Sequence, residues 1–324
     1  EEYLPFVPDN HGRFPSAASL ASRENFLEIP LADLWVLRMA SLLEKKYPGF
    51  LYKAGSFTFL PTIDIDMAWA YLGKPLWKQL LGLVGDLYRR NFRRMAIRLA
   101  VWKGKKTDSF DTCDRILALH RACGLGEICF FLFSRSGSRK DPNVDPSHPK
   151  FRVFIQNLAR STQPGIHPSY YSMDKQELIA AEKQAMEAVC ASRITKSRQH
   201  FIRFRCPETF RGLIRAGILE DYSMGYPDAP GFRAGIARPF PWFDLEQNKP
   251  TKLMLYPFQL MDVTLKQYLG LPPEQAKSKI STLVRKTREV GGLFVSIWHN
   301  SSFAKEWGWE GWEGVYKHLL REAG

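Results

Sequence analysis

The segment from Phe57 to Trp69 constrains the fold more than any other part of the chain. Most of its residues before the first aspartate are apolar, aromatic or β-branched, which is typical of a strand buried on both faces of a parallel sheet. The run ends in Asp64 and Asp66, and residues two apart on an extended backbone point to the same face. Because α/β proteins keep their active sites at the carboxyl ends of parallel strands, the segment predicts acidic chemistry at that end.

Two carboxylates this close raise the free-energy cost of ionising both. Such a pair therefore tends to share a proton or to lie beside a cation. The spacing also fits two solvated aspartates where a strand meets a loop, since short Asp-x-Asp matches occur by chance. Residues elsewhere in the chain are needed to choose between these two interpretations.

Strand-like and helix-like segments alternate after this first strand. Apolar runs predict strands at 127–133, 193–204, 217–221, 231–245, 252–261 and 292–299, with a short strand near 165. Amphipathic spacing predicts helices at 108–126, 151–159, 174–190, 207–216, 273–290 and 309–321. Repeated alternation with short connections is typical of βα units. We therefore predict an α/β fold, a distorted (β/α) barrel of about seven parallel strands.

The first 50 residues differ in character from the predicted barrel. They open with an irregular stretch, followed by a helix that begins near Pro30 and stops at Pro48 and Gly49. We expect residues 1–50 to form an N-terminal helical appendage packed on the barrel, which would occupy 51–324. The given chain carries no signal peptide, and we expect a cytoplasmic or membrane-peripheral location.

Composition narrows the class of protein. A chain of 324 residues with 45% hydrophobic content can bury a large core. No apolar run reaches the roughly 18 residues that a membrane-spanning helix needs. The five cysteines are odd in number and form no Cys-x-x-Cys pair, which argues against a disulfide framework and a cysteine zinc site.

The net charge of +13 suggests an anionic partner. Much of the excess lies between Lys74 and Lys106, where Asp86 is the single acid and apolar residues recur at helical spacing. We predict one basic amphipathic helix across 74–106. Its basic side fits either a solvated outer face or a peripheral contact with an anionic surface. No nucleic-acid-binding module accompanies it, so no nucleic-acid partner is expected.

Polar residues also follow other predicted strands. They are His167, the pair Arg198 and His200, and His299. Each histidine by itself would more often be an ordinary core or surface residue, but strand ends of a barrel converge on one rim. A carboxylate with two imidazoles suits a divalent ion that keeps open positions for water.

At this point the chain, from about residue 55 to 320, resembles the polysaccharide deacetylases, carbohydrate esterase family four or the NodB homology group. It is closest to a divergent branch with an Asp-x-Asp opening motif. The order and spacing of short motifs carry the resemblance: Thr62-Ile-Asp64-Ile-Asp66, Gly165-Ile-His167-Pro-Ser, Ser197-Arg-Gln-His200, Phe204-Arg-Cys-Pro207, Asp221-Tyr-Ser-Met-Gly-Tyr226, Gly231-Phe-Arg-Ala-Gly235 and Ile297-Trp-His299-Asn300.

The resemblance implies a metal-dependent hydrolase that removes N-acetyl groups from a sugar polymer or glycoconjugate. Asp64 would be the general base, Asp66 and His167 metal ligands, and His299 the acid that protonates the leaving amine. The implied cofactor is a divalent metal ion, with zinc expected, and the implied partner is an N-acetylated carbohydrate.

Two further catalytic roles follow from the resemblance. Arg205 matches the family's Arg-x-Pro motif literally, while Arg198 is a competing candidate for the arginine that orients the base. Asp221 resembles the aspartate of a later family motif.

The chain departs from the family pattern at one ligand. The family's second histidine lies four residues after the first, and here that position is Tyr171. Either His200 replaces the missing ligand, or water does, or the site binds no metal. Without a metal, the chain would be a catalytically inactive deacetylase-like barrel that binds carbohydrate or a protein partner. A third hypothesis is a glycosidase that pairs Asp64 or Asp66 with a distant acid, Asp221 or Asp262.

Overall fold

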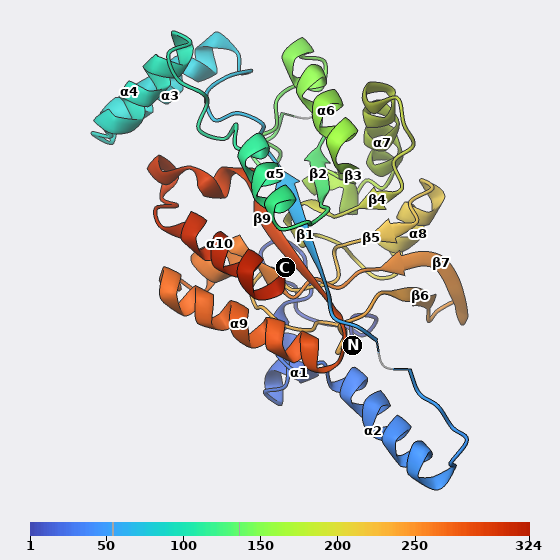
Figure 1. Cartoon of the computed structure of the whole chain (residues 1–324). Coiled ribbons are helices and arrows are strands. Elements are labelled where there is room, and N and C mark those ends of the chain that lie inside the picture. The colour runs from blue at the N-terminus through green and yellow to red at the C-terminus, as the bar shows by residue number, and fades with distance from the viewer. Residues whose placement is uncertain (54, 136) are drawn as a thin grey trace.

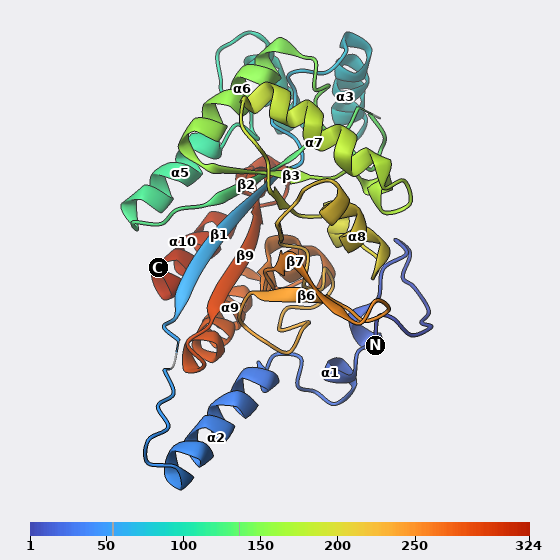
Figure 2. The same ribbon diagram turned by 90° about the vertical axis from the view of Figure 1, so that its right-hand side faces the viewer.

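The computed structural model describes residues 1–53, 55–135 and 137–324. The chain folds around one nine-stranded sheet in the order β6-β7-β5-β4-β3-β2-β1-β9-β8, with helices around it (Figures 1 and 2). Among the described strands, β6 (Phe240–Asp244) alone runs antiparallel, to β7 (Lys249–Leu255). The predicted α/β class with a parallel sheet is confirmed.

The strands that carry the predicted site residues are parallel neighbours. β1 (Thr58–Ile65) lies between β2 (Ile128–Leu132) and β9 (Leu293–His299), and β3 (Gln163–His167) follows β2. Their side chains are largely buried because helices cover the sheet, as the apolar runs predict. The register pairs Asp64 of β1 with His299 of β9, so two predicted site residues become neighbours.

Other strands are shorter than predicted. Over 193–204 the structure has only β4 (Lys196–Ser197), because the chain then enters a 3₁₀ turn in which Phe201 and Ile202 adopt left-handed backbone angles. β5 is Glu220–Asp221, and the expected strand over 231–245 begins only at β6. Gly231 and Gly235 both have positive φ, which an extended strand excludes.

The predicted strand at 252–261 is two separate strands. After β7 the chain crosses the end of the barrel, and β8 (Leu260–Met261) then pairs with β9. The backbone N–H of Tyr256 donates to the carbonyl of Asp221 at 2.8 Å, while that of Gln259 donates to Val295 at 3.1 Å. The residues between β7 and β8 thus bond to strands on both sides of the sheet and bridge them.

Two helices precede β1, and the later helices alternate with the strands as βα units require. Their bounds are α1 (Leu20–Arg23), α2 (Leu31–Lys46), α5 (Cys113–Ala122), α6 (Pro149–Ser161), α7 (Glu177–Cys190), α8 (Glu208–Arg215), α9 (Pro273–Glu289) and α10 (Trp312–Ala323). Each larger helix around the sheet directs apolar side chains inward, so the core lies between the sheet and this shell. No described helix is long and apolar enough to cross a bilayer.

The prediction of one basic helix over 74–106 is wrong. The segment is a hairpin of α3 (Leu76–Tyr88) and α4 (Phe92–Trp102), which projects from one end of the molecule (Figure 1). Arg90 has φ of +52°, and the Asn91 side chain accepts the N–H of Arg94, so the chain turns and a new helix begins.

The segment before β1 lies against the later part of the chain. The N–H of Phe232 donates to the carbonyl of Leu27 at 2.8 Å, and Arg233 forms an ion pair with Glu2 at 2.7 Å. α2 extends from the body at the end opposite the hairpin (Figures 1 and 2). The division into residues 1–50 and 51–324 remains a prediction.

Candidate active site

The end of β1 places Asp64 in the interior, beside a guanidinium. Nη1 of the fully buried Arg198 donates to Oδ1 of Asp64 at 2.6 Å and to Oγ1 of Thr62 at 2.8 Å. Its Nε donates to the carbonyl of Tyr222 at 3.0 Å, and the group lies 4.4 Å from the ring centre of Phe130. Arg198 is therefore fixed, and it holds one oxygen of Asp64 while leaving Oδ2 on the side of His167, 3.8 Å away.

The structure does not bring Arg205 to this site. Arg205 is exposed and does not line the cleft described below. Arg198, directly after β4, points inward in its place. Of the two competing arginines, Arg198 is the one beside Asp64.

Asp221 lies beneath the site and not on its surface. Its carboxylate accepts bonds from Oγ of Ser197 at 2.6 Å and from the backbone N–H of Ser223 at 3.0 Å. Burial raises the pKa of Asp221 to about 6, although these bonds and the Arg198 charge lower it. Asp221 thus ties β4 to the chain after β5, and within the described residues its carboxylate bonds Ser197 and Ser223, not Asp64.

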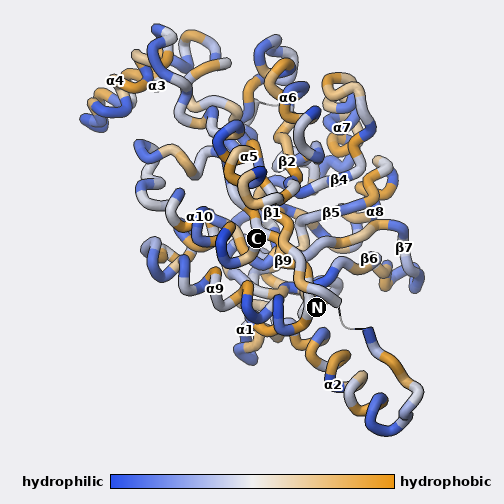
Figure 3. The backbone as a smooth tube through the Cα atoms, in the orientation of Figure 1, coloured by the Kyte–Doolittle hydropathy of each residue, from blue (hydrophilic) through white to orange (hydrophobic). Residues whose placement is uncertain are grey.

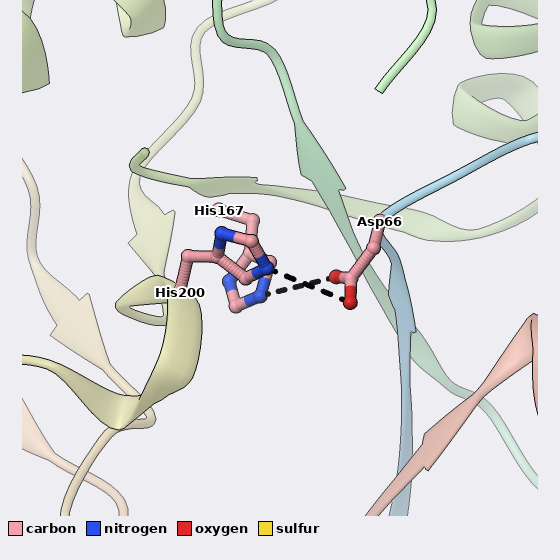
Figure 4. Close-up of side chains that lie close together, drawn as sticks. All are labelled: Asp66, His167 and His200. Carbon is pink, nitrogen blue, oxygen red and sulfur yellow. Dashed lines mark ion pairs between the residues drawn. The ribbon is translucent and has the colours of Figure 1, made fainter. Parts of the chain in front are cut away.

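Asp66, His167 and His200 form a group that could hold a metal ion (Figure 4). Nε2 of His167 lies 3.4 Å from Oδ1 of Asp66, and Nε2 of His200 lies 3.6 Å from Oδ2. One ligand atom from each of the three residues lies within 4.8 Å of the others. Within the described residues, Oδ1 of Asp66 is buried without a hydrogen-bond partner. A buried carboxylate oxygen in that state suits a cation.

Outer groups orient both imidazoles for ligation. Nδ1 of His167 lies 2.5 Å from the carbonyl of Arg198, which can only accept, so Nδ1 carries a proton and Nε2 is the nitrogen that faces Asp66. Nδ1 of His200 lies 3.0 Å from Oδ1 of Asp141. Metal-binding histidines commonly bond a backbone carbonyl or a carboxylate through their other nitrogen. The donor set therefore fits a divalent cation.

Asp66 and His200 each shift the pKa of the other. Burial favours a raised pKa for Asp66, but the charge of His200 and the imidazoles of both histidines beside it hold the value well below its usual range. Burial favours a lowered pKa for His200, but Asp66 and Asp141 raise it to about 9. Asp66 is therefore a carboxylate at neutral pH, and a cation held here would compete with the proton of His200.

His299 approaches from the opposite side at the end of β9. Its Nδ1 lies 2.8 Å from Oδ1 of Asp262, and its Nε2 lies 3.8 Å from Oδ2 of Asp66. Its own backbone N–H and the hydroxyl of Ser302 donate to the other oxygen of Asp262. Burial lowers the pKa of His299, but the Asp262 carboxylate outweighs it and raises the value to about 10. The imidazolium at neutral pH has Nε2–H available.

These residues line one cleft of about 500 Å³. Its walls are Arg13, Asp64, Asp66, His167, His200, Phe201, Ile202, Pro227, Met261, Val263, Gln267, Tyr268, His299, Ser301 and Trp309. Tyr171, at the family's usual ligand position, is 41% exposed and lines a separate hollow with Glu182. The structure thus places His200, and not Tyr171, beside His167.

Sequence reasoning missed three residues that support the site. Arg13 comes from the expected appendage, and its Nη1 donates to the carbonyl of Phe201 at 2.6 Å, which braces the left-handed turn that carries His200. Asp141 lies in a turn-rich segment with no strand pattern, so no periodicity signals it. Asp262 was named only as a distant acid, although its place directly after β8 is the same strand-end signal as for Asp64.

Sequence comparisons match only the first part of the chain. A family profile described as a family of unknown function, DUF7033, matches residues 1–48. No curated protein matches the sequence significantly.

Solved structures match most of the chain. A structure from Mycobacterium smegmatis, titled as a candidate polysaccharide deacetylase, matches with a TM-score of 0.53 and 14% identity over 84% of this chain and 85% of that one. One from Pseudomonas aeruginosa PAO1, described as a probable polysaccharide deacetylase, matches with a TM-score of 0.48 and 11% identity over 82% of this chain and 83% of that one. A CE4-family pseudoenzyme from Bacillus anthracis gives 0.38 and 9% over 83% and 67%.

Of these three likenesses, the first alone reaches a TM-score of 0.5. At 14% identity it establishes a shared fold and no activity. The predicted resemblance to the polysaccharide deacetylases is confirmed at the level of fold.

Proposed function

We propose that this protein is a metal-dependent hydrolase of the polysaccharide deacetylase type, which removes N-acetyl groups from a sugar polymer or glycoconjugate. The observation that carries the proposal is the meeting of Asp66, His167 and His200 in one cleft with Asp64 and His299 on either side. A metal triad, a buried carboxylate and an imidazolium together make a site for amide hydrolysis.

Asp66, His167 and His200 would hold the divalent cation. Carboxylate and imidazole ligands with open positions suit zinc. When bound, such a cation polarises an amide carbonyl and lowers the pKa of water from about 15.7 to near 7.

Asp64 would act as the base. Arg198 holds its Oδ1, so Oδ2 faces the cleft in a fixed direction and can accept the proton of the water that attacks the acetyl carbon. The hydrogen bonds of Arg198 to Thr62 and to the Tyr222 carbonyl prevent this carboxylate from turning away.

His299 would act as the acid. As the C–N bond of the amide breaks, its Nε2 proton passes to the nitrogen, and the new C–O bond leaves acetate and a free amine. Asp262 holds the ring in place through Nδ1. The apolar faces of Phe201, Tyr268 and Trp309 line the same cleft and offer stacking surfaces for a sugar ring.

The test is acetate release from zinc-loaded protein with N-acetylglucosamine oligomers. Asp64→Asn should lower kcat by about 10²–10⁴-fold, the usual contribution of a general base, with unchanged zinc content. Asp114→Asn, an exposed acid on α5, is the matched control and should keep full activity.

Acetate release that survives Asp64→Asn would contradict the proposed roles. If the zinc-loaded wild type binds the oligomers but releases no acetate, the protein is an inactive barrel that binds carbohydrate.

A further inference from the structure

One face of the α3–α4 hairpin exposes a continuous apolar stripe. Seven side chains of α3 are each between 54% and 89% exposed: Leu76, Trp77, Leu80, Leu81, Val84, Leu87 and Tyr88. Their spacing of one, three and four residues places them on a single side of the helix. Figure 3 shows α3 and α4 projecting from the body with apolar and polar stretches in alternation. A contiguous apolar face of this kind marks an interaction surface.

Buried ion pairs nevertheless hold the two helices of the hairpin together. Asp86 is buried on the side of α3 that faces α4, where Arg94 binds one of its oxygens at 2.5 Å and Arg98 the other at 2.7 Å. The Arg98 guanidinium also lies 4.7 Å from the ring centre of Tyr71. These contacts fix the orientation of α3, so its apolar stripe has no partner within the hairpin.

The base of the hairpin is anchored to the barrel rim. The carboxylate of Asp108 accepts the backbone N–H groups of Ala70, Tyr71 and Leu72 at 2.6–3.1 Å. This anchored segment begins directly after Asp66, and both ribbon views show the hairpin at the end of the molecule toward which β1 runs. The stripe therefore has a fixed position at the end of the barrel that carries the site.

The charge around the stripe is strongly positive. From Lys74 to Lys106 there are ten basic residues and one acid, a net charge of +9 out of +13 for the whole chain. The acid is the buried and paired Asp86, so the described surface of the hairpin carries no carboxylate. Arg89, Arg90 and Arg93 are exposed at the turn, next to the 58% exposed Phe92.

We propose that the α3–α4 hairpin docks the protein on an anionic lipid bilayer. Leucine and aromatic side chains would enter the boundary between headgroups and acyl chains, while the arginines of the turn contact lipid phosphates. Trp77 and Tyr88 have the amphipathic rings that favour this boundary. A second copy of the chain is a poor partner for the stripe, because it would bring two surfaces of net charge +9 together.

The test is co-sedimentation of the full chain with vesicles of phosphatidylcholine alone and with roughly one third phosphatidylserine. Binding should be at least about tenfold tighter to the anionic vesicles and should weaken as salt is added. Neither measurement depends on a metal or on hydrolysis, so failure of the proposed activity leaves this result unaffected.

Two variants separate the charge from the apolar stripe. Arg89→Gln/Arg90→Gln/Arg93→Gln should weaken binding to anionic vesicles by about 100-fold, since each base near such a surface contributes about fivefold. Leu80→Ser/Leu81→Ser/Val84→Ser should weaken it by at least about tenfold and abolish the fluorescence shift of Trp77 on binding. All six positions are exposed, so folding should be retained, which circular dichroism checks.

The matched control changes apolar residues at the opposite end of the molecule. Trp35 and Met39 on α2 are 65% and 63% exposed, and Trp35→Ser/Met39→Ser should bind vesicles as the wild type does. Equal binding to neutral and anionic vesicles would overturn the proposal. It would also be overturned if the protein formed dimers that the leucine variant dissolves, or if polyglutamate bound the hairpin while vesicles did not.

Discussion

At the residue scale, each of the three imidazoles of the site bonds a different acceptor, and these acceptors distinguish the candidate ligands from the candidate acid. His167 bonds a backbone carbonyl and His200 bonds Asp141, so both direct Nε2 toward Asp66. His299 instead bonds Asp262 through both its ring and its backbone N–H. The same side-chain type thus supplies two candidate ligands and one candidate acid.

The role of His299 predicts a dependence of activity on pH. Its acid form is present below the pKa of about 10 and is lost as pH rises through that value, so kcat/KM should fall on the alkaline side. Asp262→Asn removes the charge that raises this pKa, and the alkaline limb should move to lower pH by about one to two units. A pH profile of acetate release measures the shift.

Ser302→Ala is the control for that experiment. It removes one hydrogen bond to Asp262 but leaves the carboxylate, so the alkaline limb should stay in place. An unchanged limb in Asp262→Asn would show that His299 is not the acid.

The sequence allowed part of this site to be predicted. Asp64, Asp66, His167 and His299 lie at or next to the ends of strands, and the ends of parallel strands converge, so their meeting follows from topology. The choice between Arg198 and Arg205 could not be made, because a tight turn decides which of them points inward. Arg13 joins the cleft through a contact between parts of the chain that are 188 residues apart, which no local pattern reveals.

At the element scale, periodicity predicted the elements that are long and buried. β1, β2 and β9 and the helix α9 lie within about two residues of their predicted bounds. The two-residue strands β4, β5 and β8 are too short to give any period. In the basic segment, the helical spacing of apolar residues continues past Arg90. Only Asn91, whose side chain caps the second helix, could have signalled the turn.

The hairpin itself depends on one buried carboxylate. Asp86→Ala would leave Arg94 and Arg98 without their partner, a change that costs about 3–5 kcal/mol for a buried pair. Because few contacts tie α3 to the barrel, we expect local melting: amide hydrogens of 76–102 should lose protection from exchange while those of β1 and β9 keep it. Hydrogen exchange measured by mass spectrometry distinguishes these regions.

Asp114→Ala on α5, which removes an exposed acid, should leave the exchange pattern unchanged. Loss of protection throughout the barrel in Asp86→Ala would contradict a hairpin that unfolds independently.

At the scale of the whole molecule, two stretches outside the long strands bring supporting residues to the site. The run from Tyr256 to Met261 bridges the two sides of the sheet, which puts Asp262 beside His299. The first 13 residues reach the turn that carries His200. The alternation of strands and helices predicted the α/β fold, but neither of these two contacts has a local sequence signal, because each joins distant segments of the chain.

The central claim is that His200 completes a metal site with Asp66 and His167. The most direct test is the metal content of protein purified without added metal and then offered zinc. We predict close to one equivalent of a divalent ion in the wild type, its loss in His167→Gln and His200→Gln, and its retention in His318→Gln on α10, with circular dichroism confirming that each variant is folded. A wild type that binds no zinc, or a folded His200→Gln variant that keeps it, would contradict the claim.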